Sequence, residues 1–265
     1  MAKADFNGDG WSDLIWQNGT TFTEWQGNGN GFTPNTFVGS VAAGWTLAAT
    51  MDFLGNGDAD LVWVNNGTFT VWDSIGSGFA PNSYVGSVGA GWTLAGVGDF
   101  TGSGRDDLLW FNAGSGTFSI WNSDGNYGFT PNSYVGSVGT GWQLVGTGDY
   151  NGDGMHDLLW RNTTTGNFTE WQSTGSGFTP NVYVGQVPTT WALKSSPTGV
   201  LTDLGAPAAP PTLAGCIDYP NQSPTLAGCI DYPSQSSPTL AGCMDYPGQP
   251  SSPLAGCVDY SARHV

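Results

Sequence analysis

The chain has 265 residues, of which 42 are glycine, 16 are proline and 13 are tryptophan, and only 10% are charged. Its formal net charge of −16, from 21 acidic and 5 basic residues, excludes nucleic acid as a partner, because phosphate recognition needs a basic face. The same balance suits cations and neutral ligands. No apolar run approaches the roughly 18 residues of a membrane helix, so we expect no membrane span.

The first element is an Asp-rich stretch, DFNGDGWSD at residues 5–13, which runs directly into an apolar segment ending at Trp16. The same unit begins again at Asp52, Asp99 and Asp149, at spacings of 47, 47 and 50 residues. Short aromatic and β-branched runs fill each unit, and glycine, asparagine and proline separate them. This pattern indicates strands joined by tight turns.

The third unit contains every strand that we expect in a repeat. The strands lie within residues 91–100, 101–112, 116–123 and 128–139. Four short strands in about 47 residues are typical of one blade of a β-propeller. Because the unit occurs four times, the sequence predicts an all-β fold with a four-bladed β-propeller.

The first unit lacks the strand that precedes each later Asp-rich stretch. Residues 189–197, TTWALKSSP, supply a strand of that type after the fourth unit. This displacement predicts strand-exchange ring closure, because pairing the last segment with the first unit hides both edges. The alternative is a half-ring that pairs with a second chain into eight blades. We divide the chain into a four-repeat β-propeller at 1–197, a linker at 198–211 and a non-globular repeat tail at 212–265.

The string GVGDFTGSGRDDLLW, at residues 96–110, and its counterparts in the other units resemble FG-GAP repeats. These repeats, also called VCBS-type repeats, occur in integrin-like propellers and in bacterial and fungal lectin-like propellers. The resemblance covers residues 4–197. It implies an extracellular or cell-surface protein that binds a glycan or a surface. It also implies Ca²⁺ in the loop D-x-D/N-x-D-G-x-x-D.

Calcium needs several oxygen ligands, usually side chains at alternate loop positions together with a carbonyl. The first and fourth loops carry the complete set, whereas the second loop has Leu54 at the third position. The predicted ligands are Asp5, Asn7, Asp9, the Trp11 carbonyl and Asp13; Asp149, Asn151, Asp153, the Met155 carbonyl and Asp157; and the less complete set Asp52, Asn56 and Asp60. The alternative is that the carboxylates only build turns by accepting backbone N–H bonds. With either interpretation, the loops have a structural role.

Tryptophans end two strands of each unit, and in one of these ranks an asparagine follows two residues later. Residues two apart in a strand share a face, so an indole and an amide lie side by side, as in sites that stack and hydrogen-bond a sugar. The alternative is that the indoles pack one blade against the next. The predicted ligand-binding residues are Trp16, Asn18, Trp63, Asn65, Trp110, Asn112, Trp160, Asn162, Trp25, Trp72, Trp121 and Trp171.

The sequence offers no catalytic constellation. His156 and His264 lie in a loop and near the C-terminus, without an evident nucleophile or acid beside them. Glu24 and Glu170 are the one candidate carboxylate pair, but they occupy equivalent positions two blades apart. We therefore expect a protein that is not an enzyme.

The tail is a second repeat array with a period of 13 to 14 residues, in which each unit reads L-A-G-C-[IMV]-D-Y between Pro/Ser/Gln spacers. We interpret each unit as a short docking strand that adds to a partner or to a neighbouring subunit. A spacer, a disulfide framework and a set of precursor peptides are the alternatives. The predicted docking or cross-linking residues are Cys216, Cys229, Cys243, Cys257, Tyr219, Tyr232, Tyr246 and Tyr260.

Three functions fit these features. The first is an extracellular binding or adhesion propeller that recognises a glycan or a cell surface and is attached through its multivalent tail. The second is a structural subunit of an extracellular filament or sheath that the tail assembles. The third is a multi-core precursor whose tail is the substrate of modification.

Overall fold

The computed structural model describes residues 4–191, 193, 230–231, 244–245 and 258–259. The chain divides into two units, residues 1–202 and 203–265, and each is described by itself. The propeller, linker and tail boundaries expected from the sequence remain predictions. Within the described residues, no helix is long and apolar enough to cross a membrane.

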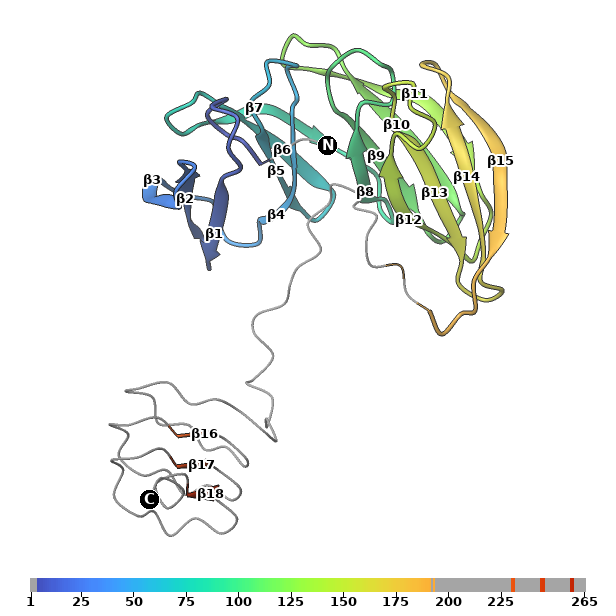
Figure 1. The fold of residues 1–265 in the computed structure, drawn as a ribbon. Helices are drawn as coiled ribbons and strands as arrows, with labels where there is room; N and C mark the ends of the chain where they lie inside the picture. Colours follow the sequence, from blue (N-terminus) through green and yellow to red (C-terminus); the bar gives the residue numbers. More distant parts are fainter. Residues whose placement is uncertain (1–3, 192, 194–229, 232–243, 246–257, 260–265) are drawn as a thin grey trace. The chain divides into compact units, whose positions relative to one another are not determined.

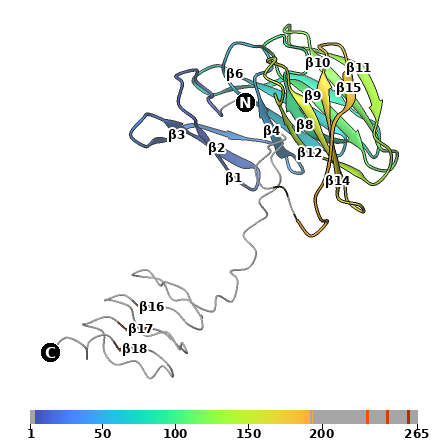
Figure 2. The same cartoon turned by 45° about the vertical axis from the view of Figure 1, so that its right-hand side comes forward.

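The described residues of the first unit form four antiparallel sheets, which follow one another along an open arc (Figure 1; Figure 2). Sheet one contains β1 (Leu14–Asn18), β2 (Thr21–Gly27) and β3 (Phe32–Ser40); sheet two contains β4 (Thr46–Met51), β5 (Asp60–Asn65), β6 (Thr68–Ser74) and β7 (Phe79–Ser87); sheet three contains β8 (Thr93–Gly98), β9 (Asp107–Asn112), β10 (Thr117–Ser123) and β11 (Phe129–Ser137); sheet four contains β12 (Trp142–Gly148), β13 (Asp157–Asn162), β14 (Asn167–Ser173) and β15 (Phe178–Gln186). The all-β fold and the four-stranded repeat are confirmed.

Each sheet is a meander whose turns follow from local sequence. Between β5 and β6, for example, Asn66 and Gly67 both have positive φ, at 48° and 81°. A two-residue turn with this geometry matches the twist of a hairpin, and asparagine and glycine adopt it readily. A bulge in β2, β6, β10 and β14 leaves one tryptophan, such as Trp121, between two paired stretches.

Adjacent sheets pack through one repeated aromatic contact, which we call the Phe–Trp joint. A phenylalanine of one sheet lies against two tryptophans of the next. Ring centroids of Phe118 lie 5.1 Å from Trp160 and 5.6 Å from Trp171. The same contact joins sheets one and two through Phe22, Trp63 and Trp72, and joins sheets two and three through Phe69, Trp110 and Trp121. The three hydrophobic cores of the unit therefore lie between sheets.

A glycine opposite the phenylalanine makes this joint possible. Phe118 pairs across the strands with Gly136. A Cβ atom at Gly136 would lie 2.5 Å from Cζ of Phe118, so any larger residue would push the ring out of the joint. The equivalent pairs in the other sheets are Phe22 with Gly39, Phe69 with Gly86 and Phe168 with Gly185.

Hydrogen bonds also connect each sheet to the next. The hydroxyl groups of Ser123 and Ser173 donate to the carbonyls of Phe53 and Phe100, both at 2.6 Å. Ser74 donates in the same way to Phe6. These serines end β6, β10 and β14, and sheet one has Gly27 at the same position, at the end of β2.

The closed four-sheet ring expected from the sequence is not formed among the described residues. Sheet one has three strands and not four, and β1 pairs only with β2. Trp16 is 53% exposed and Phe32 is 47% exposed, whereas their counterparts in the other sheets are buried. Of the predicted closing segment 189–197, residues 192 and 194–197 lie outside the described residues, and the others are not in a strand.

The described residues of the second unit form a small parallel sheet from three tail repeats. Its strands are β16 (Ile230–Asp231), β17 (Met244–Asp245) and β18 (Val258–Asp259), paired in register. Equivalent residues of successive repeats therefore lie side by side in the backbone ladder. The predicted docking cysteines and tyrosines, Cys216, Cys229, Cys243, Cys257, Tyr219, Tyr232, Tyr246 and Tyr260, lie outside the described residues.

The Phe–Trp joint predicts unequal effects of one substitution at equivalent positions. Phe118→Ala should lower the free energy of unfolding by about 3–5 kcal/mol, because it opens a cavity between two sheets. Phe168 occupies the matching position of sheet four, where its ring is half-buried. Phe168→Ala should therefore lower the free energy of unfolding by less than half of the loss caused by Phe118→Ala. Denaturant unfolding at low protein concentration measures both losses. Equal losses would contradict the structural role of the joint.

Candidate ligand pocket and Asp-rich loops

The tryptophans predicted to bind a ligand lie mostly inside the joints. Trp63, Trp110 and Trp160 are buried, and the rings of Phe22, Phe69 and Phe118 cover them. Of the second rank, Trp72 and Trp171 are buried, and Trp25 and Trp121 are half-buried. A ring face that is covered by protein cannot stack a sugar. Trp16 is the member of the two ranks that is exposed.

The asparagines that accompany these tryptophans occupy turns. The side-chain oxygen of Asn112 accepts the backbone N–H of Gly114 at 3.1 Å, and that of Asn162 accepts the N–H of Thr164 at 3.0 Å. Asn18 is exposed, and Asn65 is half-buried. The structure therefore places the amides at the turns and most of the indoles in the joints, without forming a shared sugar-binding surface.

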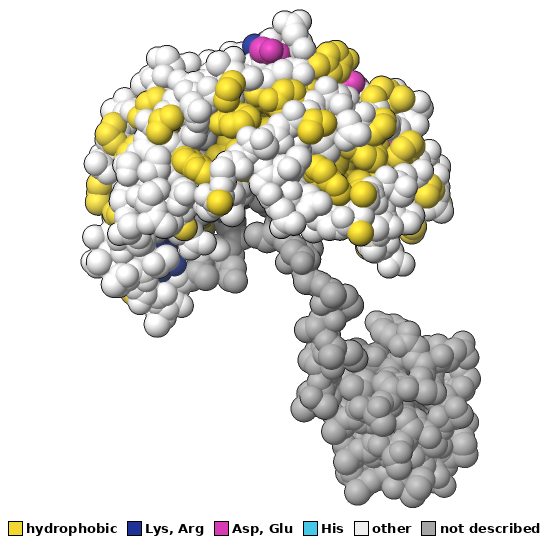
Figure 3. Space-filling model, turned by 180° about the vertical axis from the view of Figure 1, so that it is seen from behind, with side chains coloured by type: hydrophobic (Ala, Val, Ile, Leu, Met, Phe, Trp, Pro, Cys, Tyr) yellow, Lys and Arg dark blue, Asp and Glu magenta, His cyan; other side chains and the backbone are white. Residues whose placement is uncertain are grey.

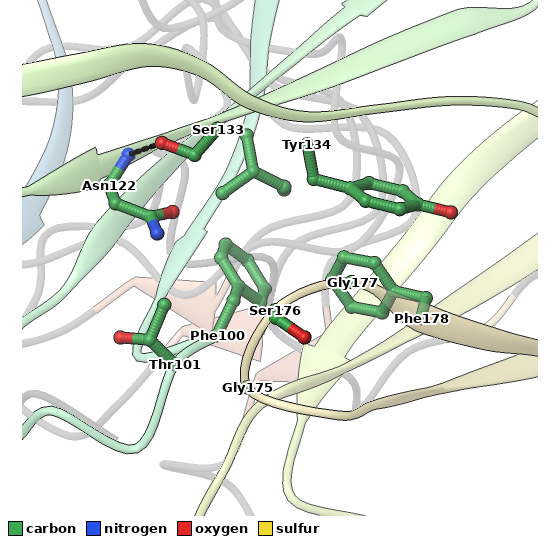
Figure 4. A pocket seen from close by; sticks show the side chains of 10 residues that line it. Phe100, Thr101, Asn122, Ser133, Tyr134, Gly175, Ser176, Gly177 and Phe178 are labelled. Atoms are coloured by element: carbon green, nitrogen blue, oxygen red, sulfur yellow. Dashed lines mark hydrogen bonds between the residues drawn. The ribbon is translucent and has the colours of Figure 1, made fainter.

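A pocket that the sequence did not indicate lies between sheets three and four (Figure 4). Its volume is about 180 Å³. Figure 4 shows Asn122 and Thr101 on one side and the rings of Tyr134 and Phe178 on the other. Its lining residues are Phe100, Thr101, Ile120, Asn122, Ser133, Tyr134, Gly175, Ser176, Gly177 and Phe178.

Hydrogen bonds and aromatic contacts hold the walls of this pocket. The hydroxyl group of Ser133 accepts the backbone N–H of Asn122 at 3.3 Å and donates to the carbonyl of Thr130 at 2.7 Å. The Tyr134 ring lies 5.4 Å from Phe178 in an edge-on arrangement, so protein packing fixes its orientation. The pocket thus combines a fixed aromatic wall with an amide and hydroxyl groups.

At the other two joints, side chains at the equivalent positions form hydrogen bonds across the joint. Between sheets one and two, Gln26 donates to Glu24 at 2.9 Å and to the carbonyl of Gly76 at 3.4 Å. Between sheets two and three, the Tyr127 hydroxyl group donates to Asp73 at 3.4 Å. Burial raises the pKa of both the Glu24 and the Asp73 carboxyl. The pocket is open at the third joint because Asn122 and small residues occupy these positions there.

The two glutamates that sequence reasoning considered as a catalytic pair do not meet. Glu24 is buried at the joint between sheets one and two, and Glu170 lies in sheet four, half-buried, with Gln172 donating to it at 2.8 Å. His156 is half-buried, and its backbone N–H donates to the carbonyl of Asp99 at 2.7 Å. His264 lies outside the described residues.

The last aspartate of each Asp-rich loop ties two backbone segments together. Both carboxylate oxygens of Asp107 accept N–H bonds, from Phe100 at 3.1 Å and from Ser123 at 2.9 Å. Asp13, Asp60 and Asp157 make the same pair of bonds in the other loops. These contacts are the turn-building role that the sequence left open as the alternative to metal binding.

The first aspartate of loop one makes fewer hydrogen bonds than the first aspartates of the other three loops. In loops two, three and four, both oxygens of Asp52, Asp99 and Asp149 accept backbone N–H bonds. In loop one, Oδ2 of Asp5 accepts the N–H of Gly10 at 2.9 Å, while its buried Oδ1 has no hydrogen-bond partner. A buried carboxylate oxygen without a donor is costly unless a ligand satisfies it.

This uncommitted oxygen lets loop one fit a small hard cation. Asn7 and Asp9 lie on the same loop, half-buried and exposed, and supply further oxygens. Asp9 and Asp153 are bonded alike, because they accept the backbone N–H of Trp11 and of Met155, both at 2.8 Å. Loop four differs in its first aspartate, since both oxygens of Asp149 accept backbone N–H bonds. Across the described residues, no group of three or more His, Cys, Asp or Glu side chains is arranged to hold a metal ion.

The comparisons with known proteins concern family and fold. Residues 5–63 and 99–160 match the FG-GAP-like repeat family. A lectin from Agrocybe aegerita, described as recognising non-reducing terminal N-acetylglucosamine, is similar in structure at 21% identity and a TM-score of 0.52, over 69% of this chain and 51% of the lectin. The Tc holotoxin pore of Photorhabdus luminescens is similar at 20% identity and a TM-score of 0.43, over 64% of this chain and 10% of that one.

This chain therefore spans about half of the lectin and a tenth of the toxin. No curated protein matches the chain in sequence. The lectin supports a propeller-like fold, and the expected resemblance to FG-GAP repeats is confirmed.

The buried aspartates predict how stability depends on pH. Burial raises the pKa of the Asp107 carboxyl to about 7, well above its ordinary value of 3.8. The folded chain then holds a proton that the unfolded chain releases, so this contribution is present near pH 4 and is lost as the pH rises through 7. We expect the free energy of unfolding to fall over that range, with Asp107 contributing on the order of 2–4 kcal/mol.

Asp107→Asn should flatten this fall, whatever its effect on absolute stability. Asp124→Asn, on an exposed turn of the same sheet, is the matched control. Denaturant unfolding at several pH values measures the slope. An unchanged slope in the Asp107 variant would show that this carboxyl is ionised throughout.

Proposed function

Since residues 5–63 and 99–160 of this chain match FG-GAP-like repeats and its fold is propeller-like, we propose that the protein is a non-catalytic, carbohydrate-binding propeller. The proposed binding site is the pocket between sheets three and four. The single observation that carries the proposal is its combination of a fixed tyrosine ring with an amide and hydroxyl groups.

The lining chemistry supports a neutral, hydroxyl-rich ligand. Sugars stack their C–H faces on aromatic rings, and Tyr134 presents such a ring at the pocket wall. Asn122 offers both a donor and an acceptor, and Ser133 and Ser176 offer hydroxyl groups. No carboxylate or imidazole is among the ten lining residues, which supports binding without catalysis. Figure 3 shows few charged side chains on the face that it presents, as suits a neutral partner.

The place of the protein and the role of its tail belong to the same proposal. FG-GAP repeats are typical of proteins outside the cell, so we assign this one to the extracellular space or the cell surface. We propose that the tail repeats attach or assemble the protein. The in-register pairing of β16, β17 and β18 supports assembly through stacking of repeats, as in the filament or sheath alternative.

We also propose a structural calcium ion at loop one. Asp5, Asn7 and Asp9 would hold it, and the ion would satisfy the buried Oδ1 of Asp5. A cation there neutralises carboxylates that otherwise repel one another. Asp13 keeps the loop in place through its two backbone N–H bonds.

Pocket variants test carbohydrate binding. Ser133→Ala and Asn122→Ala should each weaken binding about 2- to 10-fold, because each removes one hydrogen bond to the ligand. The measurement is binding to a glycan array, followed by titration of the best ligand. Oligosaccharides ending in N-acetylglucosamine are the first probe, since the Agrocybe aegerita lectin is described as recognising that sugar.

Ser83→Ala is the matched control for Ser133→Ala. Ser83 accepts the N–H of Asp73 at 3.3 Å and donates to Ala80 at 3.0 Å, so it makes the same local bonds as Ser133 without lining the pocket. The control should bind like the parent. Equal losses in both serine variants, or no glycan binding by the parent, would contradict a sugar site in this pocket.

Calcium should raise the melting temperature of the protein, and chelation should reverse the rise, because an ion that binds only the folded state stabilises it. Asp9→Ala should remove most of this shift. Ser103→Ala, at the equivalent position of loop three, is the control and should keep it. A calcium response that survives in the Asp9 variant would place the ion elsewhere.

A further inference from the structure

We propose that the two ends of the arc are complementary halves of a Phe–Trp joint, through which a second copy of this chain docks head to tail. Sheet one of one copy would receive sheet four of the other. The new contact would repeat the joint that connects sheets within the chain. This inference does not depend on the proposed carbohydrate site.

The sheet-one end is a tryptophan pair without its phenylalanine. Ring centroids of Trp16 and Trp25 lie 5.6 Å apart. The equivalent pair in sheet two, Trp63 and Trp72, is spaced at 5.8 Å and has Phe22 packed against both rings. The first sheet thus already holds the receiving geometry, but with Trp16 in solvent.

The sheet-four end is a phenylalanine without its tryptophan pair. Phe168 is half-buried, whereas Phe118 at the same place in sheet three is fully buried between two tryptophans. Tyr183, next to Phe168, is 55% exposed. A cavity of about 200 Å³ opens beside Phe168, with Leu159 also in its wall. This face is apolar and unfilled.

The chain after sheet four continues as it does after sheets one and two. Trp191 donates its backbone N–H to the carbonyl of Pro188 at 2.9 Å, as Trp45 and Trp92 donate to the residues three before them. Trp45 and Trp92 then lead into β4 and β8, the inner strands of the next sheets, and are partly buried at the joints. Trp191 stands at the same point with 67% of its surface exposed.

Among the described residues, sheet one is the sheet that lacks such an inner strand, so β1 is the edge strand of that sheet there. In a head-to-tail pair, Trp191 and Leu193, which line the cavity beside Phe168, would face sheet one of the other copy. The docked pair would then bury the Trp16–Trp25 face.

Two sequence differences between the end sheets and the inner sheets make this joint different from the internal ones. Arg161 stands where sheet three has Phe111, whose ring lies 5.2 Å from Trp160. In the docked pair Arg161 would reach Trp16, and a guanidinium on an indole face is a favourable contact. Gly27 lacks the hydroxyl group that Ser74 and Ser123 use across their joints. The new joint therefore has one hydrogen bond fewer than the internal ones.

A second copy fits these faces better than the chain's own ends do. Figures 1 and 2 both show sheets one and four at opposite ends of the arc, so the two faces do not meet within one chain. A contact between two different faces of identical chains either closes into a ring or extends as a filament. Both arrangements use the same joint.

The test uses the full chain with one charge placed in each half of the joint. The parent should show a molar mass that rises above that of the monomer with concentration in sedimentation velocity. Phe168→Asp and Trp16→Asp should each raise the dissociation constant at least about tenfold, because each buries a charge in an apolar joint. Val135→Asp, on an exposed position of β11, is the control and should associate like the parent.

Mixing the two end variants gives the decisive result. The Trp16 variant keeps an intact sheet four and the Phe168 variant keeps an intact sheet one, so one good joint remains and a mixed dimer should form. Circular dichroism and thermal unfolding establish that both variants are folded. A parent that stays monomeric at every concentration, end variants that associate as well as the parent, or a mixture that stays monomeric would each overturn the proposal.

Discussion

The four sheets of the first unit carry apolar side chains that a single sheet cannot bury alone. The Phe–Trp joint solves this problem, since it places one aromatic ring of a sheet between two indoles of its neighbour and removes all three from water. The remaining features follow from it. Gly136 gives the ring room, Ser123 and Ser173 hold the joint with hydrogen bonds, and the candidate pocket is a place where the joint is incompletely filled.

The four-stranded repeat is predictable from the spacing of Asp52, Asp99 and Asp149, because period, strand length and turn residues all depend on local sequence. The angle between neighbouring sheets does not depend on local sequence. This angle decides whether four sheets close into a ring or form an open arc. Trp16 and Trp63 stand in nearly the same local sequence, yet one is exposed and the other is buried, because burial depends on whether another sheet precedes theirs and supplies the phenylalanine.

The pocket could not be predicted from the sequence, because it also depends on how two sheets meet. Asn122 aligns with Gln26 and Asp73, and all three look like ordinary polar strand residues. Their difference matters only at a joint, where the longer or charged side chains find a partner and fill the space. The Asp-rich loops, by contrast, are recognisable by pattern, but the pattern does not separate a metal ligand from an acceptor of backbone N–H bonds. Only the structure shows that Oδ1 of Asp5, in loop one, is buried without a hydrogen-bond partner.

The glycine that faces each joint phenylalanine recurs in all four sheets, so every joint is built from the same set of parts. In an array of this kind, stability is close to a sum of nearest-neighbour terms. The two central sheets are held from both sides and the two outer sheets from one. Gain or loss of a whole repeat during evolution would therefore leave the remaining joints intact and change only the length of the arc. In such a protein, the contact between neighbouring sheets is retained, whereas the number of sheets can change.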